Sequence, residues 1–373
     1  MREVWRWVGV ALLYWVALGV QAQGAVIRLG QSLPLTGALA ELGTEYRDGM
    51  LAHFKQLNAK GGIHGRKVEL TTLDDGYVVE RSVENTRKLL ENPELLGLIG
   101  MFGSANYGAV LPLIDEKAIP SLAPYTGSDE LRAQKSASTF WLRASYGDET
   151  EKIVDQLTTL GITRIAVFYQ DDAFGKSGLA GVEKALARRN LKVVATGAFD
   201  KAKNDVRDAV KSISAADPQS VVMISTYKPT AAFFREMKAA GKQTQFFALS
   251  VVGYKALQAE IGQGAAGIAI AQVVPYPWSG VTGIVRDFLA LPPEFAPKSG
   301  PTYTAMEGFI AARVMSEALR RAGPNPTRDK LTAALASLNK LDLGGFVVDY
   351  SRNRLGSSFV EVTVVGSSGR LMR

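Results

Sequence analysis

The chain has 373 residues, of which 47% are hydrophobic and 21% charged, proportions typical of a globular protein rather than a disordered one. It contains no cysteine, so disulfides, thiol nucleophiles, cysteine metal sites and a lipid attached to a cysteine are all excluded. The net charge of +7 is spread along the chain without a basic stripe interleaved with aromatic residues, which argues against nucleic-acid binding.

The first 22 residues have the pattern of a secretory signal peptide. Two arginines precede an apolar run from Val8 to Val20, and the small residues Val20 and Ala22 occupy the positions that a signal peptidase reads. The alternative is a single membrane anchor, for which the run is short and lacks a stop-transfer flank. We therefore expect cleavage after Ala22 and a monomeric protein that diffuses freely in the periplasm, without a lipid tether.

From residue 26 onward, short apolar runs alternate with amphipathic stretches, the pattern of strand–helix–strand units around a mostly parallel sheet. In chain order, the pattern predicts strands at 26–33, 67–73, 97–101, 119–123, 140–143, 164–169, 192–196, 220–225, 245–249 and 267–272. It predicts the intervening helices at 43–60, 80–91, 105–117, 149–160, 176–189, 205–215, 230–240 and 254–261. After a proline-rich stretch, helices follow at 303–322 and 327–338, and the chain ends in strands at 345–350, 358–365 and 370–372.

This succession predicts an α/β fold in two halves. The rhythm of strands and helices restarts near residue 146, and a chain of this length exceeds what one hydrophobic core usually serves. The late return of the chain to helices and then to strands indicates that each half is built from discontinuous segments.

Motifs for catalysis and for metal binding are absent. The two histidines, His53 and His64, lack the spacing of a metal pair, and no Gly-x-Ser-x-Gly turn is present to carry a nucleophilic serine. Residues 175–177 resemble the end of a phosphate-binding loop, but Gln170 stands where that loop needs a glycine. We therefore expect a protein that is not an enzyme, with no catalytic residue, no metal and no cofactor.

Hydroxyl and aromatic residues recur where the predicted strands end. Ligands of open α/β sheets bind beyond the carboxyl ends of the strands, so these positions are candidates for a small-molecule site. Ser104 follows the strand at 97–101 and starts a helix, where it would bind a carboxylate or, alternatively, act only as an N-cap. The full set of candidates is Ser104, Tyr125, Thr126, Gly127, Ser128, Tyr146, Phe174, Tyr227 and Ser250.

Several passages, in this order, resemble the periplasmic leucine/isoleucine/valine-binding protein family, the type I solute-binding proteins of ABC importers. They include residues 31–37 (QSLPLTG), 57–66 (LNAKGGIHGR), 74–75, 100–104, 164–169 and 239–241. The resemblance implies two Rossmann-like lobes with mostly parallel sheets, joined by a three-strand hinge. Lobe 1 would comprise 26–145 with 274–356, and lobe 2 would comprise 146–273 with 357–373.

The resemblance also implies a function and roles for individual residues. The protein would capture an amino acid of the branched-chain type, or a related small polar solute, by closure of its lobes and deliver it to an inner-membrane ABC permease. Ser104 stands at the family's ligand-binding serine, and Leu42 at a position that lines the side-chain pocket. The family's threonine aligns with Gly127, for which Thr126 or Ser128 would substitute.

One position departs from the family. Its amino-acid binders place a glutamate after the strand that ends here at residue 249, to pair with the ligand's ammonium, whereas this chain has Ser250. A buried ammonium without a partner is costly. Either Asp148 or Glu149 then supplies the charge, or the ligand has no α-amino group and is an amide, a carboxylate or an aromatic acid. The alternative to transport is a periplasmic sensory module that presents such a solute to a membrane kinase or chemoreceptor.

Overall fold

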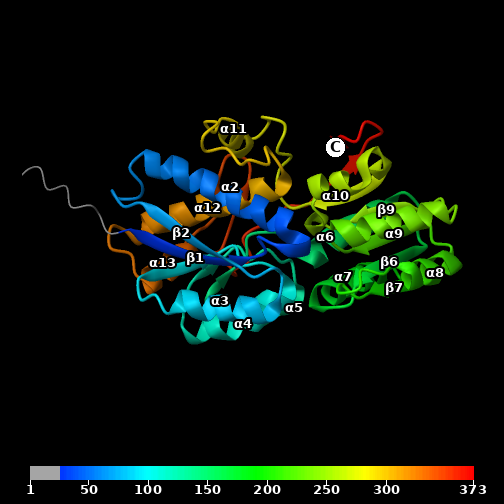
Figure 1. The fold of residues 1–373 in the computed structure, drawn as a ribbon, viewed down its shortest axis with the longest axis horizontal. Helices are drawn as coiled ribbons and strands as arrows, with labels where there is room; N and C mark the ends of the chain where they lie inside the picture. Colours follow the sequence, from blue (N-terminus) through cyan, green and yellow to red (C-terminus); the bar gives the residue numbers. More distant parts are fainter. Residues whose placement is uncertain (1–25) are drawn as a thin grey trace, which may run out of the picture.

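Two β-sheets organise the chain, each at the centre of one lobe (Figure 1). The computed structural model describes residues 26–373, so the predicted signal peptide at 1–22 lies outside the described residues. Within residues 26–373, no helix is long and apolar enough to cross a membrane.

The first lobe contains a five-stranded parallel sheet. Its strands, from one edge to the other, are β2 (Val68–Asp74), β1 (Ile27–Leu33), β3 (Leu95–Ile99), β4 (Ser121–Leu122) and β5 (Thr139–Phe140). The helical segments that follow these strands are η1 (Gly37–Leu39), α2 (Ala40–Ala59), α3 (Val79–Leu90), α4 (Ser104–Glu116) and α5 (Asp129–Ala133). A later part of the chain adds α11 (Gly283–Leu289), α12 (Tyr303–Ala322), α13 (Arg328–Ala336) and a hairpin of β11 (Leu341–Asp342) and β12 (Val347–Val348).

The central strands of this sheet are buried because helices cover both faces. In Figure 1, α2 and α12 lie on one side of β1, and α3 and α4 lie on the other. β3 (LLGLI) is buried at every residue and β1 at all but one. Strands buried along nearly their whole length are expected in a parallel sheet that is covered on both faces.

The second lobe contains a seven-stranded mixed sheet. Its strands in spatial order are β14 (Leu371–Met372), β13 (Glu361–Val365), β10 (Ile268–Gln272), β9 (Gln245–Ala248), β8 (Ser220–Ile224), β6 (Ile165–Gln170) and β7 (Thr196–Phe199). Its helical segments are α6 (Tyr146–Thr159), α7 (Ala173–Ala187), α8 (Arg207–Ala216), α9 (Tyr227–Ala239), η2 (Ser250–Val252), α10 (Tyr254–Ile261) and η3 (Gly262–Ala265). Only β13 runs opposite to the other strands of this sheet, because it pairs antiparallel with both β10 and β14. The two sheets confirm the predicted fold class, a two-lobed α/β protein with mostly parallel strands.

The chain passes between the lobes three times, after β5, after β10 and after β12. Figure 1 shows the consequence, because the C-terminal end lies beside α10 in the second lobe although the segment before it belongs to the first. We propose the lobe boundaries at 145/146, 273/274 and 356/357, within the three connecting segments. In other two-lobed proteins, segments that connect the lobes act as the hinge about which the lobes rotate.

The helices α2 and α12 are packed backbone to backbone and share a buried histidine. A Cβ atom on Gly49 would lie 1.9 Å from the carbonyl oxygen of Ala305, so only glycine fits this crossing. His53 of α2 lies 2.9 Å from the hydroxyl of Ser316 of α12 and contacts the edge of the Phe309 ring. Burial, with nearby arginines as a further cause, lowers the pKa of His53 to about 3.

Replacing His53 with glutamine is expected to flatten the acid branch of the stability curve. Below pH 6.5 the unfolded chain protonates this histidine while the folded protein does not, so stability falls as the pH decreases toward 3. One such group contributes a slope of up to about 1.4 kcal/mol per pH unit. Urea denaturation of both proteins between pH 4 and 7 measures the slope; equal slopes would contradict a neutral, buried His53.

Candidate functional site

A narrow cavity lies between the two lobes, and its empty space of about 280 Å³ includes the solvent at its open mouth. Its walls come from segments that follow strand ends in both sheets, the place where α/β proteins bind their ligands. The first lobe contributes Leu39, Leu42, Tyr77, Phe102, Gly103, Ser104 and Tyr125. The second lobe contributes Tyr146, Phe174, Thr226 and Val251. Because residues of both lobes line the cavity, a small molecule held there would touch both lobes at once.

The structure brings four of the nine candidate residues to the cavity wall: Ser104, Tyr125, Tyr146 and Phe174. The other five do not line it: Thr126, Gly127, Ser128, Tyr227 and Ser250. Their direct contact with a ligand remains a prediction. In the second lobe the wall is formed instead by the residue before Tyr227 and the residue after Ser250, so the predicted loops are near the cavity but shifted by one position.

Ser104 does not act as an N-cap, the alternative role considered for it. It is the first residue of α4, and the N-cap is Gly103, at a positive φ of 88° and without any side chain to bond the free N–H groups. The Ser104 hydroxyl lies 2.7 Å from that of Thr126. The Ser104 hydroxyl, with Thr126 behind it, and an uncapped helix N-terminus therefore meet at one wall of the cavity, an arrangement that favours a carboxylate or another acceptor.

The loop that contains Thr126 also explains why glycine stands where the resemblance places a threonine. A Cβ on Gly127 would lie 2.6 Å from Cδ1 and 2.8 Å from the backbone nitrogen of Tyr146. Because no side chain fits at Gly127, the hydroxyl comes from Thr126, which also accepts a hydrogen bond from the Ser128 backbone at 3.2 Å. The Ser128 side chain caps α5 by accepting from Leu131 N.

Two contacts across the cleft join the lobes. Tyr227 of α9 donates a hydrogen bond to the carbonyl oxygen of Ala38 in the first lobe. Nearby, the Lys201 ammonium lies 4.6 Å from the centre of the Tyr77 ring. Tyr227 thus joins the lobes beside the cavity, a role that the sequence did not suggest.

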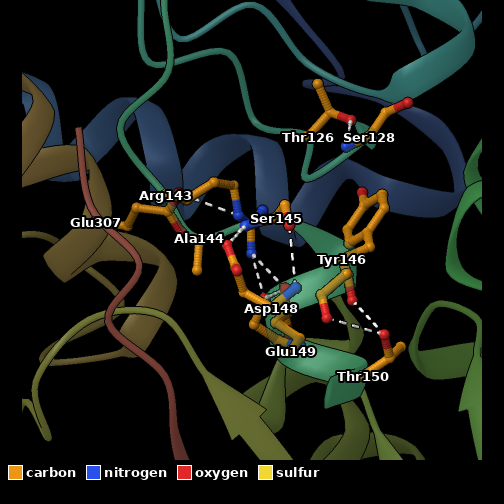
Figure 2. Close-up of polar contacts among 12 residues, drawn as sticks. Thr126, Ser128, Arg143, Ala144, Ser145, Tyr146, Asp148, Glu149, Thr150 and Glu307 are labelled. Carbon is orange, nitrogen blue, oxygen red and sulfur yellow. Dashed lines mark hydrogen bonds and ion pairs between the residues drawn. The ribbon is translucent and has the colours of Figure 1, made fainter. Parts of the chain in front are cut away.

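Behind the cavity wall, a buried arginine connects the two lobes. Figure 2 shows the Arg143 side chain between Glu307, from α12 of the first lobe, and Glu149, from α6 of the second. Its guanidinium lies 3.6 Å from Glu307 and 3.9 Å from Glu149, and its carbon centre lies 4.5 Å from the centre of the Tyr125 ring. It also donates to the Ser250 hydroxyl.

Ser250 is held by the same network. Its backbone nitrogen donates to one carboxylate oxygen of Glu149 at 2.7 Å and its hydroxyl donates to the other at 3.0 Å. Burial raises the pKa of Glu149 to about 7, opposed by Arg143 and by these two hydrogen bonds. Burial by itself lowers the pKa of Arg143, but the electrostatic influence of Glu307, Tyr125 and Glu149 is larger and raises the pKa above its usual value. The guanidinium therefore stays protonated.

Comparisons with known proteins agree with this architecture. Residues 26–366 match the family described as Periplasmic binding protein. A Leu/Ile/Val-binding protein homolog of Brucella melitensis is 22% identical over 91% of this chain and 86% of its own length. The match with an amino acid binding protein of Pseudomonas aeruginosa, 24% identical, spans 60% of each chain.

Among solved structures, the substrate-binding periplasmic protein of Ralstonia solanacearum is 34% identical, with a TM-score of 0.87 over 93% of this chain and 99% of that one. One assignment follows from the strand order, the cleft between the lobes and these matches. The chain belongs to the periplasmic binding protein family, and its curated relatives include proteins named Leu/Ile/Val-binding.

Proposed function

We propose that the chain is the substrate-binding component of an ABC importer, a monomer that works in the periplasm and is not an enzyme. It would capture an amino acid or a related small polar solute by closure of its two lobes and release it to an inner-membrane permease. The observation that supports this most is the position of the cavity, whose wall combines Ser104 of the first lobe with Phe174 of the second. A ligand held by both lobes stabilises their closed arrangement.

The composition of the site also favours binding over catalysis. The cavity is lined by apolar and aromatic side chains with the Ser104 hydroxyl at one wall, and no histidine or carboxylate is among its lining residues. Within residues 26–373, no group of three histidine, aspartate or glutamate side chains is placed to hold a metal ion. Sites of this kind fix a ligand by shape and by a few polar groups.

Replacing Ser104 with alanine tests the proposal. Loss of its hydrogen bond to a charged ligand group is expected to weaken binding by about 1.5–3 kcal/mol, or about 10- to 150-fold. The ligand is first found by thermal shift with amino acids and their deaminated and amide analogues, where about 100 times the dissociation constant adds about 2.7 kcal/mol. Titration calorimetry then compares the variant with the native protein.

A matched control is Ser316→Ala, which removes another buried serine hydroxyl, the one beside His53 in the first lobe. This variant should lose some stability and keep its affinity. Unchanged affinity in Ser104→Ala would remove Ser104 from the binding site. Uptake of the labelled ligand by cells with and without the gene separates transport from a sensory role, because only a transport component is needed for accumulation.

A further inference from the structure

We propose that the ligand is a small carboxylate with an apolar body and without an α-ammonium group. This inference rests on the function proposed above. The first support is the charge of the site. No aspartate, glutamate, lysine or arginine lines the cavity. The cleft continues outward through a larger hollow that shares Leu39, Tyr77 and Thr226 with the cavity, and the charged residues that line this hollow are Lys201 and Lys228. Both charged side chains that line this hollow are positive; Asp172 lies 3.5 Å from Lys201, so Lys228 is the one that favours an anion there.

Two buried carboxylates behind the cavity wall already have partners. Both oxygens of Glu149 accept hydrogen bonds from Ser250, and Glu307 lies against Arg143. Neither glutamate lines the cavity. Asp148 is exposed and completes the capping box of α6. Neither residue 148 nor residue 149 therefore offers a carboxylate at the cavity wall to pair with a ligand ammonium. A buried ammonium without a counter-charge is strongly disfavoured.

The wall of the cavity at the N-terminus of α4, in the first lobe, offers hydrogen-bond donors to a carboxylate. The N-terminus of α4 has a glycine cap without a side-chain bond, so its free N–H groups face a ligand together with the Ser104 hydroxyl. Thr126 lies directly behind Ser104 and orients that hydroxyl. Lys228 at the outer hollow forms no ion pair with any residue in the range 26–373, whereas Lys201 lies 3.5 Å from Asp172.

The remaining walls are apolar and largely aromatic. The ring of Phe102 stacks on that of Tyr125 at 4.6 Å, and the Tyr146 and Phe174 rings pack together at 5.3 Å from the other lobe. Aliphatic surface from Leu42 completes the wall. Such surroundings hold an aromatic or branched hydrocarbon body by burial of apolar area and by ring contacts.

The test uses pairs of compounds that differ only in the α-ammonium group. Calorimetric titrations of the native protein at pH 7 compare 3-phenylpropanoate with L-phenylalanine, and 4-methylpentanoate with L-leucine. The acid of at least one pair should bind at least about 100-fold more tightly than its amino acid. The neutral 3-phenylpropanamide should bind more weakly than its acid, because it cannot use the anion site.

Different outcomes separate this inference from the function on which it rests. Equal or tighter binding of an amino acid would overturn the inference while supporting the proposed function. Equal binding of the amide and the acid would overturn the carboxylate assignment. If neither the acids nor the amino acids bind at millimolar concentration, the inference fails, and the proposed function fails with it when the amide analogues do not bind either.

Two matched variants of Val251, which lines the cavity from the second lobe, test the charge argument within the site. Val251→Glu adds a carboxylate to the wall, and Val251→Gln adds the same volume without charge. The glutamate variant should bind the acid at least about tenfold more weakly than the glutamine variant does. Circular dichroism confirms that both are folded. Equal affinities of two folded variants for the acid would contradict the inference.

Discussion

Replacing Arg143 with methionine is expected to lower the free energy of unfolding by about 3–5 kcal/mol. The substitution leaves Glu149 and Glu307 buried without their counter-charge, and it removes the contact with the Tyr125 ring. Breaking a buried ion pair from one side is costly because the remaining charge stays in a medium that solvates it poorly. Guanidinium denaturation at pH 7.5 measures the loss.

The pH dependence of the stability loss in Arg143→Met identifies the buried carboxylates as the cause of that loss. Burial raises the pKa of Glu149 and of Glu307, and removal of Arg143 removes an influence that lowers both. A carboxyl group whose pKa is raised by folding stabilises the protein most below its unfolded value of about 4.5 and loses that contribution as the pH rises through the folded value. The deficit of Arg143→Met should therefore shrink from pH 7.5 to pH 5.

The double variant Arg143→Met/Glu307→Gln is the control for this prediction. It removes one of the two uncompensated charges with little change in volume, so it should be more stable than the single variant. A loss below about 1 kcal/mol in Arg143→Met, the median value of an exposed pair, would contradict a central role for this network.

Replacing Gly127 with threonine, the residue that the resemblance places there, is expected to damage the site. The new Cβ would meet the Tyr146 ring and backbone at 2.6–2.8 Å, so Tyr146 must move away from the cavity wall. Overpacking of this kind costs about 1–3 kcal/mol of stability. Ligand affinity should fall at least about tenfold, because the displaced ring lines the cavity and the neighbouring Thr126 contacts Ser104 of the cavity wall.

Gly108→Ala is the matched control. Gly108 also lies in the first lobe, within α4, but its added methyl group would meet only the end of the Leu131 side chain at 3.2 Å. This variant should change stability by no more than about 1 kcal/mol and leave affinity unchanged. Native affinity in Gly127→Thr would show that the loop adapts and that Tyr146 does not form a fixed wall.

The fold could be predicted from the sequence where local pattern and tertiary environment agree. Helices α10 and α12 begin and end at the predicted residues. The strand expected at 192–196 is wrong, because the residues paired with β6 begin at Thr196 and continue to Phe199. Helices α5 and α11 were not predicted; α5 has five residues, and α11 lies in the proline-rich stretch, where the prolines suggested irregular structure.

The site could be predicted to the level of its loops but not of its individual contacts. Strand-end position led to Ser104, Tyr125, Tyr146 and Phe174 because strand ends of parallel sheets converge. It could not show which residue of a loop faces inward, so Thr226 and Val251 were missed in favour of their neighbours. The partners of Arg143 lie far apart in the sequence, and no local pattern indicates that a buried network joins them.

Small-angle X-ray scattering of the mature protein, with and without 3-phenylpropanoate or L-leucine, tests most directly whether this chain works by closure of two lobes on a ligand. We predict a larger radius of gyration without ligand, and a scattering curve that matches the closed structure, with Tyr227 against Ala38, once a ligand binds. Identical scattering curves with and without a compound that calorimetry shows to bind would contradict the proposed mechanism.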